Sequence, residues 1–282
     1  MLRIIISPAK KMNVFDDYHC ALTTPVYLER TKELLELLKQ KSLPQLQTLW
    51  QCSDKLAQEN YDRLHTYRLD SQLTPALLAY EGIQYQYLSP QVFSDSQWQY
   101  VNDSLRILSG FYGILRPTDG VIPYRLEMQA KLDTASAHGL YDFWGSSLCE
   151  ELIRTDDGAS ASGKAASPQT AAQAAASDNS VKTDDANADS LEIINLASAE
   201  YSRAVLPFIP SHIRCVTCVF GELKDGKVKV KATQAKMARG EMVRWAAENQ
   251  IMHSQDLKAF HSLNYRFHPE LSGEEKLVFI RQ

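Results

Sequence analysis

The order of apolar and polar positions predicts a chain in which strands and helices intermix. Residues 2–6 and 191–195 are short apolar runs without alternation, which is typical of strands covered on both faces. Ser94 and Gln97 fit a capping box that opens a helix. By such signals and by helical spacing of apolar residues, we expect helices over residues 28–40, 44–51, 54–66, 94–109, 199–205 and 235–249. The pattern therefore predicts an α/β class in the mixed α+β sense, with buried central strands.

A β-hairpin is predicted near the C-terminus. Residues 213–223 and 228–233 are strand-like, and the Asp225-Gly226 pair between them favours a tight hairpin turn. Cys215 and Cys218 lie three apart on the first strand, so we expect their side chains on opposite faces. Two separate thiols are thus favoured over a redox or zinc pair. The five scattered cysteines are typical of reduced thiols.

The composition is that of a soluble globular protein, with 44% hydrophobic and 23% charged residues. No apolar run reaches the length of about 18 residues that suggests a membrane span. The apolar run near Met1 is too short for the core of a signal peptide. We therefore expect a cytoplasmic protein without a membrane partner.

Residues 155–190 stand apart from the rest of the chain. They consist mostly of Ala, Ser and Asp, and their six aspartates and two lysines account for the whole net charge of −4. Such a segment cannot bury enough apolar surface to offset the entropy of ordering it. We expect a disordered insertion, with residues 1–154 and 191–282 forming one domain. Any basic surface on that domain must come from local clustering.

Both buried strands run into polar loops. The first is followed by Ser7-Pro8-Ala9-Lys10, and the second leads to Ser198. Ligands gather at the carboxyl ends of parallel strands. Ser198 could cap the next helix, whose free N–H groups favour an anion, with Lys10 as a charge beside it. The alternative is that Ser198 only caps and Lys10 is only solvated.

Residues 224–244 hold seven basic residues and two acidic ones. In the predicted helix, Lys236 and Arg239 are three apart and share a face. Gly240 lies beside them, although glycine costs about 1 kcal/mol relative to alanine inside a helix. It therefore indicates close approach by another element of the protein or by a phosphate backbone.

Residues 49–57 resemble a helix–hairpin–helix element, in which two helices meet at a tight turn that aims N–H groups at phosphate. Its apolar and small positions are filled by Leu49, Cys52 and Ala57. Ser53 can cap the second helix, and Lys55 adds positive charge. Gln51 and Ser53 replace the usual glycines. A plain helical hairpin remains the alternative.

The stretch LSGFYGILRPTDGVIPYRLEM, residues 108–128, contains several turn signals. Gly110 is predicted to stop the helix that Ser94 opens. Gly113 cannot begin another long helix, because Pro117 would break it. Arg125 and Glu127 alternate with apolar neighbours and face the other way from them, either as a surface pair or as catalytic groups. We predict a rigid turn that presents four side chains to a shared cleft, namely Arg116, Asp119, Arg125 and Glu127.

No conventional catalytic or metal motif is present. The seven histidines show no metal-ligand spacing, and there is no P-loop, G-x-S-x-G, H-E-x-x-H or dinucleotide fingerprint. We predict no metal site and no cofactor.

Five motifs, IIISPAK, LSGFYGILRPTDGVIPYRLEM, LYDFWG, INLASAEY and AKMARG, occur in this order. Together they resemble the bacterial peroxide stress protein YaaA family over the whole chain except residues 155–190. The resemblance implies a single-domain α/β fold with a basic cleft and a helix–hairpin–helix element. It also implies a protein that binds double-stranded DNA and lowers free iron during hydrogen peroxide stress. No established reaction comes with the family.

The resemblance carries the family's motif positions to particular residues here. They are Ser7, Pro8, Lys10, Arg116, Asp119, Tyr124, Arg125, Glu127, Asn195, Ser198, Lys236 and Arg239. Three positions depart from the family pattern: Lys11 replaces a usual Thr, Tyr87 a common Gly, and Gln129 the Gly after RLEM. Lys11 adds positive charge next to Lys10.

The leading hypothesis is a DNA-binding stress protein, with a monomer favoured and little sequence preference. Its phosphate contacts would be Lys10, Ser53, Lys55, Arg116, Arg125, Ser198, Lys236 and Arg239. Its cleft would be shaped by Ser7, Pro8, Tyr124, Asn195 and Gly240.

The alternative is an enzyme acting on a nucleotide or nucleic acid, with Lys10 as nucleophile or charge clamp and Asp119 or Glu127 as acid or base. That alternative requires Lys10, Asp119, Glu127 and Ser198 to converge in one pocket. Direct iron sequestration is disfavoured by the scattered histidines.

Overall fold

The protein is built around one mostly parallel sheet, described here from a computed structural model that covers residues 1–154 and 191–282. The insertion predicted at residues 155–190 lies outside the described residues. The main sheet runs β11-β12-β9-β8-β1-β5-β6, and β10 pairs with β9. Its strands are β1 (Leu2–Ile6), β5 (Leu105–Ser109), β6 (Gly113–Leu115), β8 (Glu192–Asn195), β9 (Arg214–Lys224), β10 (Lys227–Lys229), β11 (Tyr265–Phe267) and β12 (Lys276–Arg281). The mixed α/β single domain predicted from the sequence is confirmed.

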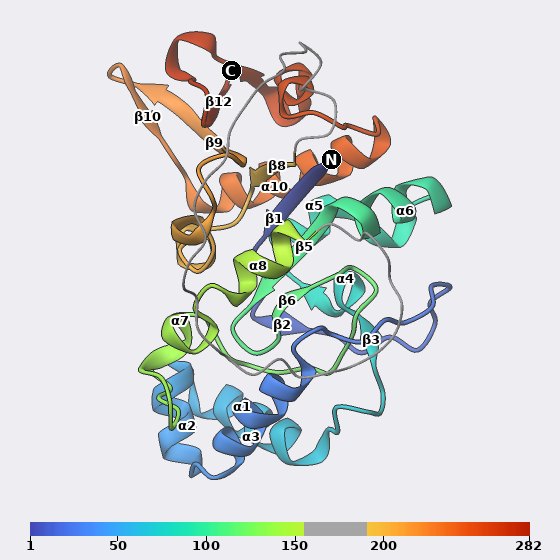
Figure 1. Cartoon of the computed structure of the whole chain (residues 1–282), viewed down its shortest axis with the longest axis vertical. Helices are drawn as coiled ribbons and strands as arrows, with labels where there is room; N and C mark the ends of the chain where they lie inside the picture. The colour runs from blue at the N-terminus through green and yellow to red at the C-terminus, as the bar shows by residue number, and fades with distance from the viewer. Residues whose placement is uncertain (155–190) are drawn as a thin grey trace, which may run out of the picture.

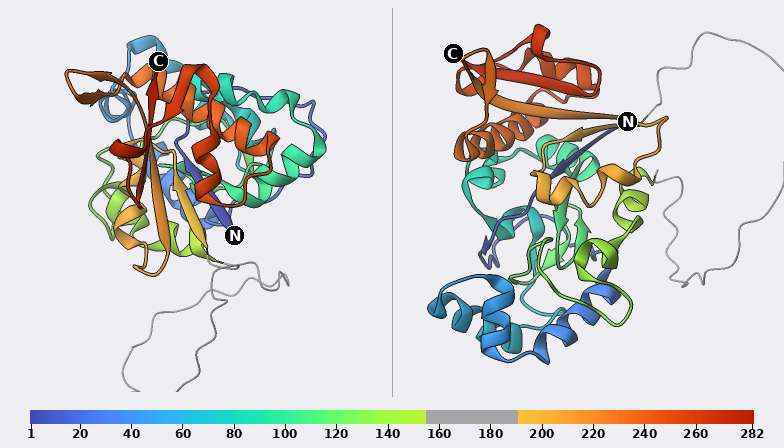
Figure 2. Two further views of the ribbon diagram at one scale, coloured as in Figure 1. Left: turned by 90° about the horizontal axis from the view of Figure 1, so that it is seen from above. Right: turned by 90° about the vertical axis from the view of Figure 1, so that its left-hand side faces the viewer.

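Helices cover both faces of this sheet. Figure 2 shows α5, α6 and α10 to one side and α8 and α9 to the other. The helices are α1 (Leu28–Lys39), α2 (Leu43–Trp50), α3 (Asp54–Thr66), α4 (Ala76–Ala79), α5 (Ile83–Leu88), α6 (Asp95–Ser104), α7 (Gly139–Trp144), α8 (Ser147–Ile153), α9 (Ala199–Ser202) and α10 (Ala232–Glu248). Short 3₁₀ turns occur at Pro90–Val92, Leu206–Phe208, Ser254–Ala259, Ser262–Asn264 and Pro269–Leu271. Two small antiparallel pairs, β2 (Lys11–Met12) with β4 (Tyr80–Glu81) and β3 (Thr74–Pro75) with β7 (Gly120–Val121), complete the described elements.

The two buried strands expected from the sequence lie side by side at the centre. All five residues of β1 are buried, and Ile4 pairs with Ile194 of β8 and with Leu105 of β5, both in parallel. Because helices cover both faces of β1, its sequence shows no polar alternation.

The helix predicted over residues 94–109 is only half correct. The capping box at Ser94 forms, but α6 ends at Ser104 and residues 105–109 are strand β5. Backbone pairing with β1 holds Leu105 and its neighbours extended, a long-range effect that local helix signals do not report. Gly110 is therefore not a helix stop, and it lies in the turn between β5 and β6.

Helices α1, α2 and α3 form a group at the lower end of Figure 1. The predicted helical pair is present: α2 ends at Trp50 with Gln51 as its C-cap, whose φ is 47°, and α3 begins after Ser53. Gln51 thus adopts the left-handed backbone that a glycine would adopt without strain. Ala57, at the contact position, is buried.

The predicted β-hairpin forms through Asp225 and Gly226, both with positive φ. Its second strand ends at Lys229, so the strand predicted to residue 233 is too long. All five cysteines are free thiols, and Cys218 is buried while Cys215 on the same strand is half-buried. No helix among the described residues is long and apolar enough to cross a membrane.

Candidate functional site

A cleft of about 400 Å³ opens beyond the carboxyl ends of β1 and β8. The Ser198 N–H donates to Ser7 Oγ at 2.8 Å, and the Ser7 hydroxyl donates to Ser198 Oγ at 3.2 Å. The chain leaves β1 to build β5 on one side and later returns to build β8 on the other. Ligands of open α/β sheets bind at such a switch point. We call this pocket the carboxyl-edge cleft.

Four motif segments meet at the carboxyl-edge cleft, of which the strand-end pattern predicted the loops after β1 and β8. Ser7, Pro8 and Lys10 come from the loop after β1, and Tyr124 to Glu127 from the RLEM segment. Ser198 lies at the start of α9, and Lys236 and Arg239 reach the cleft from α10. Residues from β4 and α5 complete the wall, among them Gln84 and Tyr85.

Five cations and three carboxylates line the cleft. They are Lys10, Lys11, Arg125, Lys236 and Arg239, with Glu81, Glu127 and Glu200. Glu127 Oε1 lies 2.8 Å from Lys10 Nζ and 3.8 Å from an Arg125 terminal nitrogen. Lys11 pairs with Glu81 at 2.8 Å. Lys236 and Arg239 make no hydrogen bond or ion pair with a described residue, so the cleft carries excess positive charge.

Glu200 is a cleft carboxylate that sequence reasoning missed. It is half-buried, and one oxygen accepts the Gln129 N–H at 3.3 Å. Burial raises the pKa of Glu200, the backbone N–H of Gln129 acts against this, and the charge of Glu127 raises it further. An acid in the first turn of a helix is typical of a solvated surface position, so only its place within the INLASAEY motif could have marked it.

Of the residues expected to shape the cleft, Ser7, Pro8 and Tyr124 line it, whereas Asn195 and Gly240 do not. Tyr124 shares hydrogen bonds of 2.7 Å with the hydroxyls of Tyr80 and Ser109, and burial raises the pKa of Tyr124 to about 12. Asn195 donates to Thr217 Oγ1 at 3.2 Å and accepts the Ala197 N–H at 3.0 Å. Asn195 is thus buried and holds the loop before Ser198, without itself lining the cleft.

Glycines permit the close packing that positions the cleft residues. A Cβ on Gly110 would lie 2.6 Å from Leu126 O and 2.9 Å from Glu127 C, so only glycine lets the RLEM segment lie against the β5–β6 turn. A Cβ on Gly240 would lie 2.0 Å from Gln84 O on α5. The close approach predicted at Gly240 is therefore made by a helix and not by a phosphate backbone.

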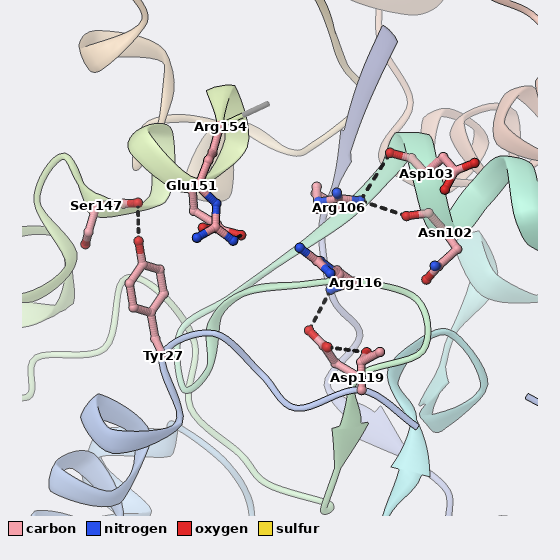
Figure 3. Close-up of polar contacts among 10 residues, drawn as sticks. Tyr27, Asn102, Asp103, Arg106, Arg116, Asp119, Ser147, Glu151 and Arg154 are labelled. Carbon is pink, nitrogen blue, oxygen red and sulfur yellow. Dashed lines mark hydrogen bonds and ion pairs between the residues drawn. The ribbon is translucent and has the colours of Figure 1, made fainter. Parts of the chain in front are cut away.

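The prediction that Arg116 and Asp119 face the same cleft is wrong. They line a separate pocket of about 140 Å³ with Arg106, Glu151 and Arg154 (Figure 3). The Asp119 carboxylate accepts the Thr23 hydroxyl at 2.6 Å and the Arg116 N–H at 2.8 Å, and burial raises the pKa of Asp119. Asp119 and Arg125 line different pockets, and Asp119 is not among the residues that line the carboxyl-edge cleft. Asp119 therefore closes its own turn, away from Lys10.

Two further predicted positions lie outside the carboxyl-edge cleft. Ser53 and Lys55 are exposed at the start of α3. In the right-hand view of Figure 2, α2 and α3 extend below the sheet towards the same side as β2. The helix after Ser198 offers a weaker anion site than expected, because α9 has only four residues and a single turn has little dipole.

Within residues 1–154 and 191–282, no group of three or more His, Cys, Asp or Glu side chains is arranged to hold a metal ion.

Comparison with known proteins assigns a family to this arrangement. A family model described as "Peroxide stress protein YaaA" matches residues 2–271. The chain is 46% identical over 280 residues to a UPF0246 protein of Pediococcus pentosaceus, covering 99% of this chain and 98% of that protein. It is 43% identical over 281 residues to a UPF0246 protein of Lactiplantibacillus plantarum, covering 100% of both. These matches include every segment that lines the carboxyl-edge cleft and the strands of the main sheet.

Proposed function

The chain belongs to the peroxide stress protein YaaA family, and from that premise we propose that it binds double-stranded DNA in the cytoplasm. Binding is to the phosphate backbone, with little sequence preference. Through this role it helps to limit iron-driven damage during hydrogen peroxide stress, together with a lowering of free iron.

The observation that supports DNA binding best is the convergence of three basic segments on one cleft. Lys10, Arg125 and Lys236 are far apart in sequence and line the same pocket. Lys10 and Lys236 are exposed at its rim, where a duplex can reach them. Neutralising phosphates with such cations releases counterions, which drives sequence-independent binding.

The α2–α3 pair supplies a second contact. The first turn of α3 is exposed and carries Lys55 next to Asp54, and the N–H groups at the start of a helix favour a phosphate. Because α2 and α3 project to the same side as β2 (Figure 2), one duplex can reach both regions. We therefore assign Ser53 and Lys55 to the DNA surface together with the cleft rim, and leave Arg116 out of it.

Fluorescence anisotropy with a labelled duplex tests this proposal. For about four phosphate contacts, the affinity for DNA falls about 100-fold between 50 and 200 mM salt. This follows because the logarithm of the binding constant falls with the logarithm of the salt concentration with a slope near −0.9 per contact. Lys236→Glu weakens binding and flattens the salt slope by about one. The matched control is Lys276→Glu, which makes the same charge change at an exposed position at the start of β12 that does not line the cleft. An equal loss of DNA affinity in Lys236→Glu and Lys276→Glu, or no binding of the duplex to the wild type at 50 mM salt, would refute the proposal.

The iron effect is tested in cells that lack the protein. Restoring the wild-type chain lowers free iron under peroxide, and Lys236→Glu fails to restore it if the effect passes through DNA binding. If free iron falls equally with the wild-type chain and with Lys236→Glu, the lowering of iron does not depend on DNA binding.

A second candidate function is an enzyme acting on a nucleotide or nucleic acid. The observation that favours it is that Lys10, Glu127 and Ser198 do share one pocket with Glu200, whose pKa is raised by burial. Asp119 has no part in it, because it lies at the other pocket. Mass spectrometry of nucleotides and oligonucleotides incubated with wild type and with Glu200→Gln would reveal a product that only the wild type forms.

A further inference from the structure

Arg239 is the cation of the carboxyl-edge cleft whose environment most requires an outside partner. Its side chain is half-buried on α10, and its Nε is buried without a hydrogen bond. By contrast, Lys10, Lys11 and Arg125 each have a carboxylate within 4 Å. Burial lowers the pKa of Arg239, as expected for a desolvated cation without a counter-charge. A partly desolvated, unpaired guanidinium is costly unless an anion binds next to it.

Two neighbouring side chains of the cleft also have buried nitrogen donors without a hydrogen-bond acceptor. The Nε2 of Gln84 and the Nε of Arg125 are buried with no hydrogen-bond partner, like the Nε of Arg239. These donors come from α5, from the RLEM segment and from α10, and all three side chains line one cleft. Two of the three cleft carboxylates, Glu127 and Glu81, are already paired with Lys10 and Lys11. A ligand that fits here is therefore negatively charged and rich in acceptors.

The size and walls of the cleft narrow the ligand class. Its volume of about 400 Å³ lies within the range of about 300–1,000 Å³ typical of small-molecule pockets. A bare phosphate ion would leave most of it empty. Ile83, Tyr85, Leu126 and Tyr201 supply apolar wall for the less polar part of a ligand.

We propose that the carboxyl-edge cleft binds one nucleotide unit, with its phosphate held by Arg239. The unit is either a free mononucleotide or the 5′-phosphorylated end of a strand. The choice of a nucleotide among phosphorylated molecules rests on the proposed binding of DNA. A continuous duplex uses the exposed rim at Lys10 and Lys236, whereas the nucleotide uses the half-buried Arg239.

Calorimetric titration with defined probes tests the inference. The probes are inorganic phosphate, a deoxynucleoside, its 5′-monophosphate, a 5′-phosphorylated single strand, and a duplex closed by loops at both ends. We expect the monophosphate to bind and the deoxynucleoside not to bind. Loss of hydrogen bonds to a charged group makes Arg239→Met bind the monophosphate about 10- to 100-fold more weakly. Arg244→Met is the matched control on the same helix, because Arg244 pairs with Glu248 and does not line the cleft.

A thermal melt separates ligand binding from a structural role of Arg239. If the unpaired charge of Arg239 serves ligand binding, Arg239→Met melts at or above the wild-type temperature without ligand. The monophosphate then raises the melting temperature of the variant by less than it raises that of the wild type. A lower melting temperature together with an undiminished shift by the monophosphate would overturn the inference. Arg239→Lys, which keeps the charge but loses the planar fork, is expected to bind with intermediate affinity. It provides the test if Arg239→Met does not fold.

The other outcomes distinguish this inference from the proposed function. A monophosphate that binds no tighter than inorganic phosphate, or that binds Arg239→Met as tightly as wild type, overturns the inference. If the closed duplex fails to bind while the monophosphate binds, DNA binding fails and the nucleotide site stands. A phosphorylated strand that binds more tightly than the free monophosphate identifies the strand end as the source of the nucleotide.

Discussion

Gly240→Ala should destabilise the protein, although alanine is the better helix former. Gly240 lies inside α10, where α10 crosses α5. The added Cβ would lie 2.0 Å from Gln84 O, 2.9 Å from Gln84 C and 3.1 Å from Leu88 N. All three are backbone atoms, so no side-chain rotation relieves the contact. The helices must instead move apart by roughly 1 Å, since a carbon–oxygen contact requires about 3.3 Å.

Two opposing effects set the magnitude. Helix propensity favours alanine over glycine by about 1 kcal/mol. Overpacking of a well-packed site costs about 1–3 kcal/mol, and a backbone clash this short belongs at the upper end. We expect a net loss of about 2 kcal/mol, which corresponds to a fall in melting temperature of about 4–8 °C for a domain of this size.

Calorimetry and urea denaturation of Gly240→Ala measure this loss. The control is Gly273→Ala, because a Cβ on Gly273 would have no neighbour within 4 Å. We expect the control to change stability by no more than about 0.5 kcal/mol. If Gly240→Ala is as stable as the wild type or more so, helix propensity outweighs packing there and the close contact between α10 and α5 is not rigid.

Two other substitutions test the groups around the cleft. Tyr124→Phe removes one hydrogen-bond partner from each of the buried Tyr80 and Ser109 hydroxyls, and urea denaturation should show a loss of about 1–3 kcal/mol, the cost of lost buried hydrogen bonds. Glu200→Gln should raise the melting temperature near neutral pH: burial raises the pKa of Glu200 above its unfolded value, so the ionised form destabilises the folded state, and this penalty disappears as the pH falls below the unfolded pKa. The difference between the Glu200→Gln variant and the wild type should therefore shrink at acidic pH, and a constant difference from pH 4 to 8 would contradict the assignment.

Local patterns in the sequence predicted the elements that depend on near neighbours. The apolar runs at β1 and β8, the capping box at Ser94 and the Asp225-Gly226 turn each act over a few residues, and each is found in the structure. The end of α6 was not predicted, because residues 105–109 are held extended by pairing with β1, about a hundred positions earlier.

For the candidate site too, local sequence patterns predicted some positions and long-range contacts decided the others. Loops after two parallel strands lie at one edge of the sheet, so the meeting of Ser7 and Ser198 followed from the strand pattern. The position of Asp119 outside the cleft did not follow from it, because the hydrogen bonds of Asp119 to the Thr23 hydroxyl and the Arg116 N–H are contacts that the strand pattern does not show. Glu200 lines the cleft and accepts the N–H of Gln129, a contact between distant segments that the sequence does not show.

The sequence by itself determined the family, the mixed α/β class and which segments carry the charged cleft residues. Only the tertiary structure decided which charges neutralise one another. Lys10 and Glu127 are more than a hundred residues apart and pair at 2.8 Å, whereas Arg239 has no such partner among the described residues. Burial and pairing depend on distances between segments that the order of residues does not contain. The excess charge at Arg239 is therefore a property of the fold.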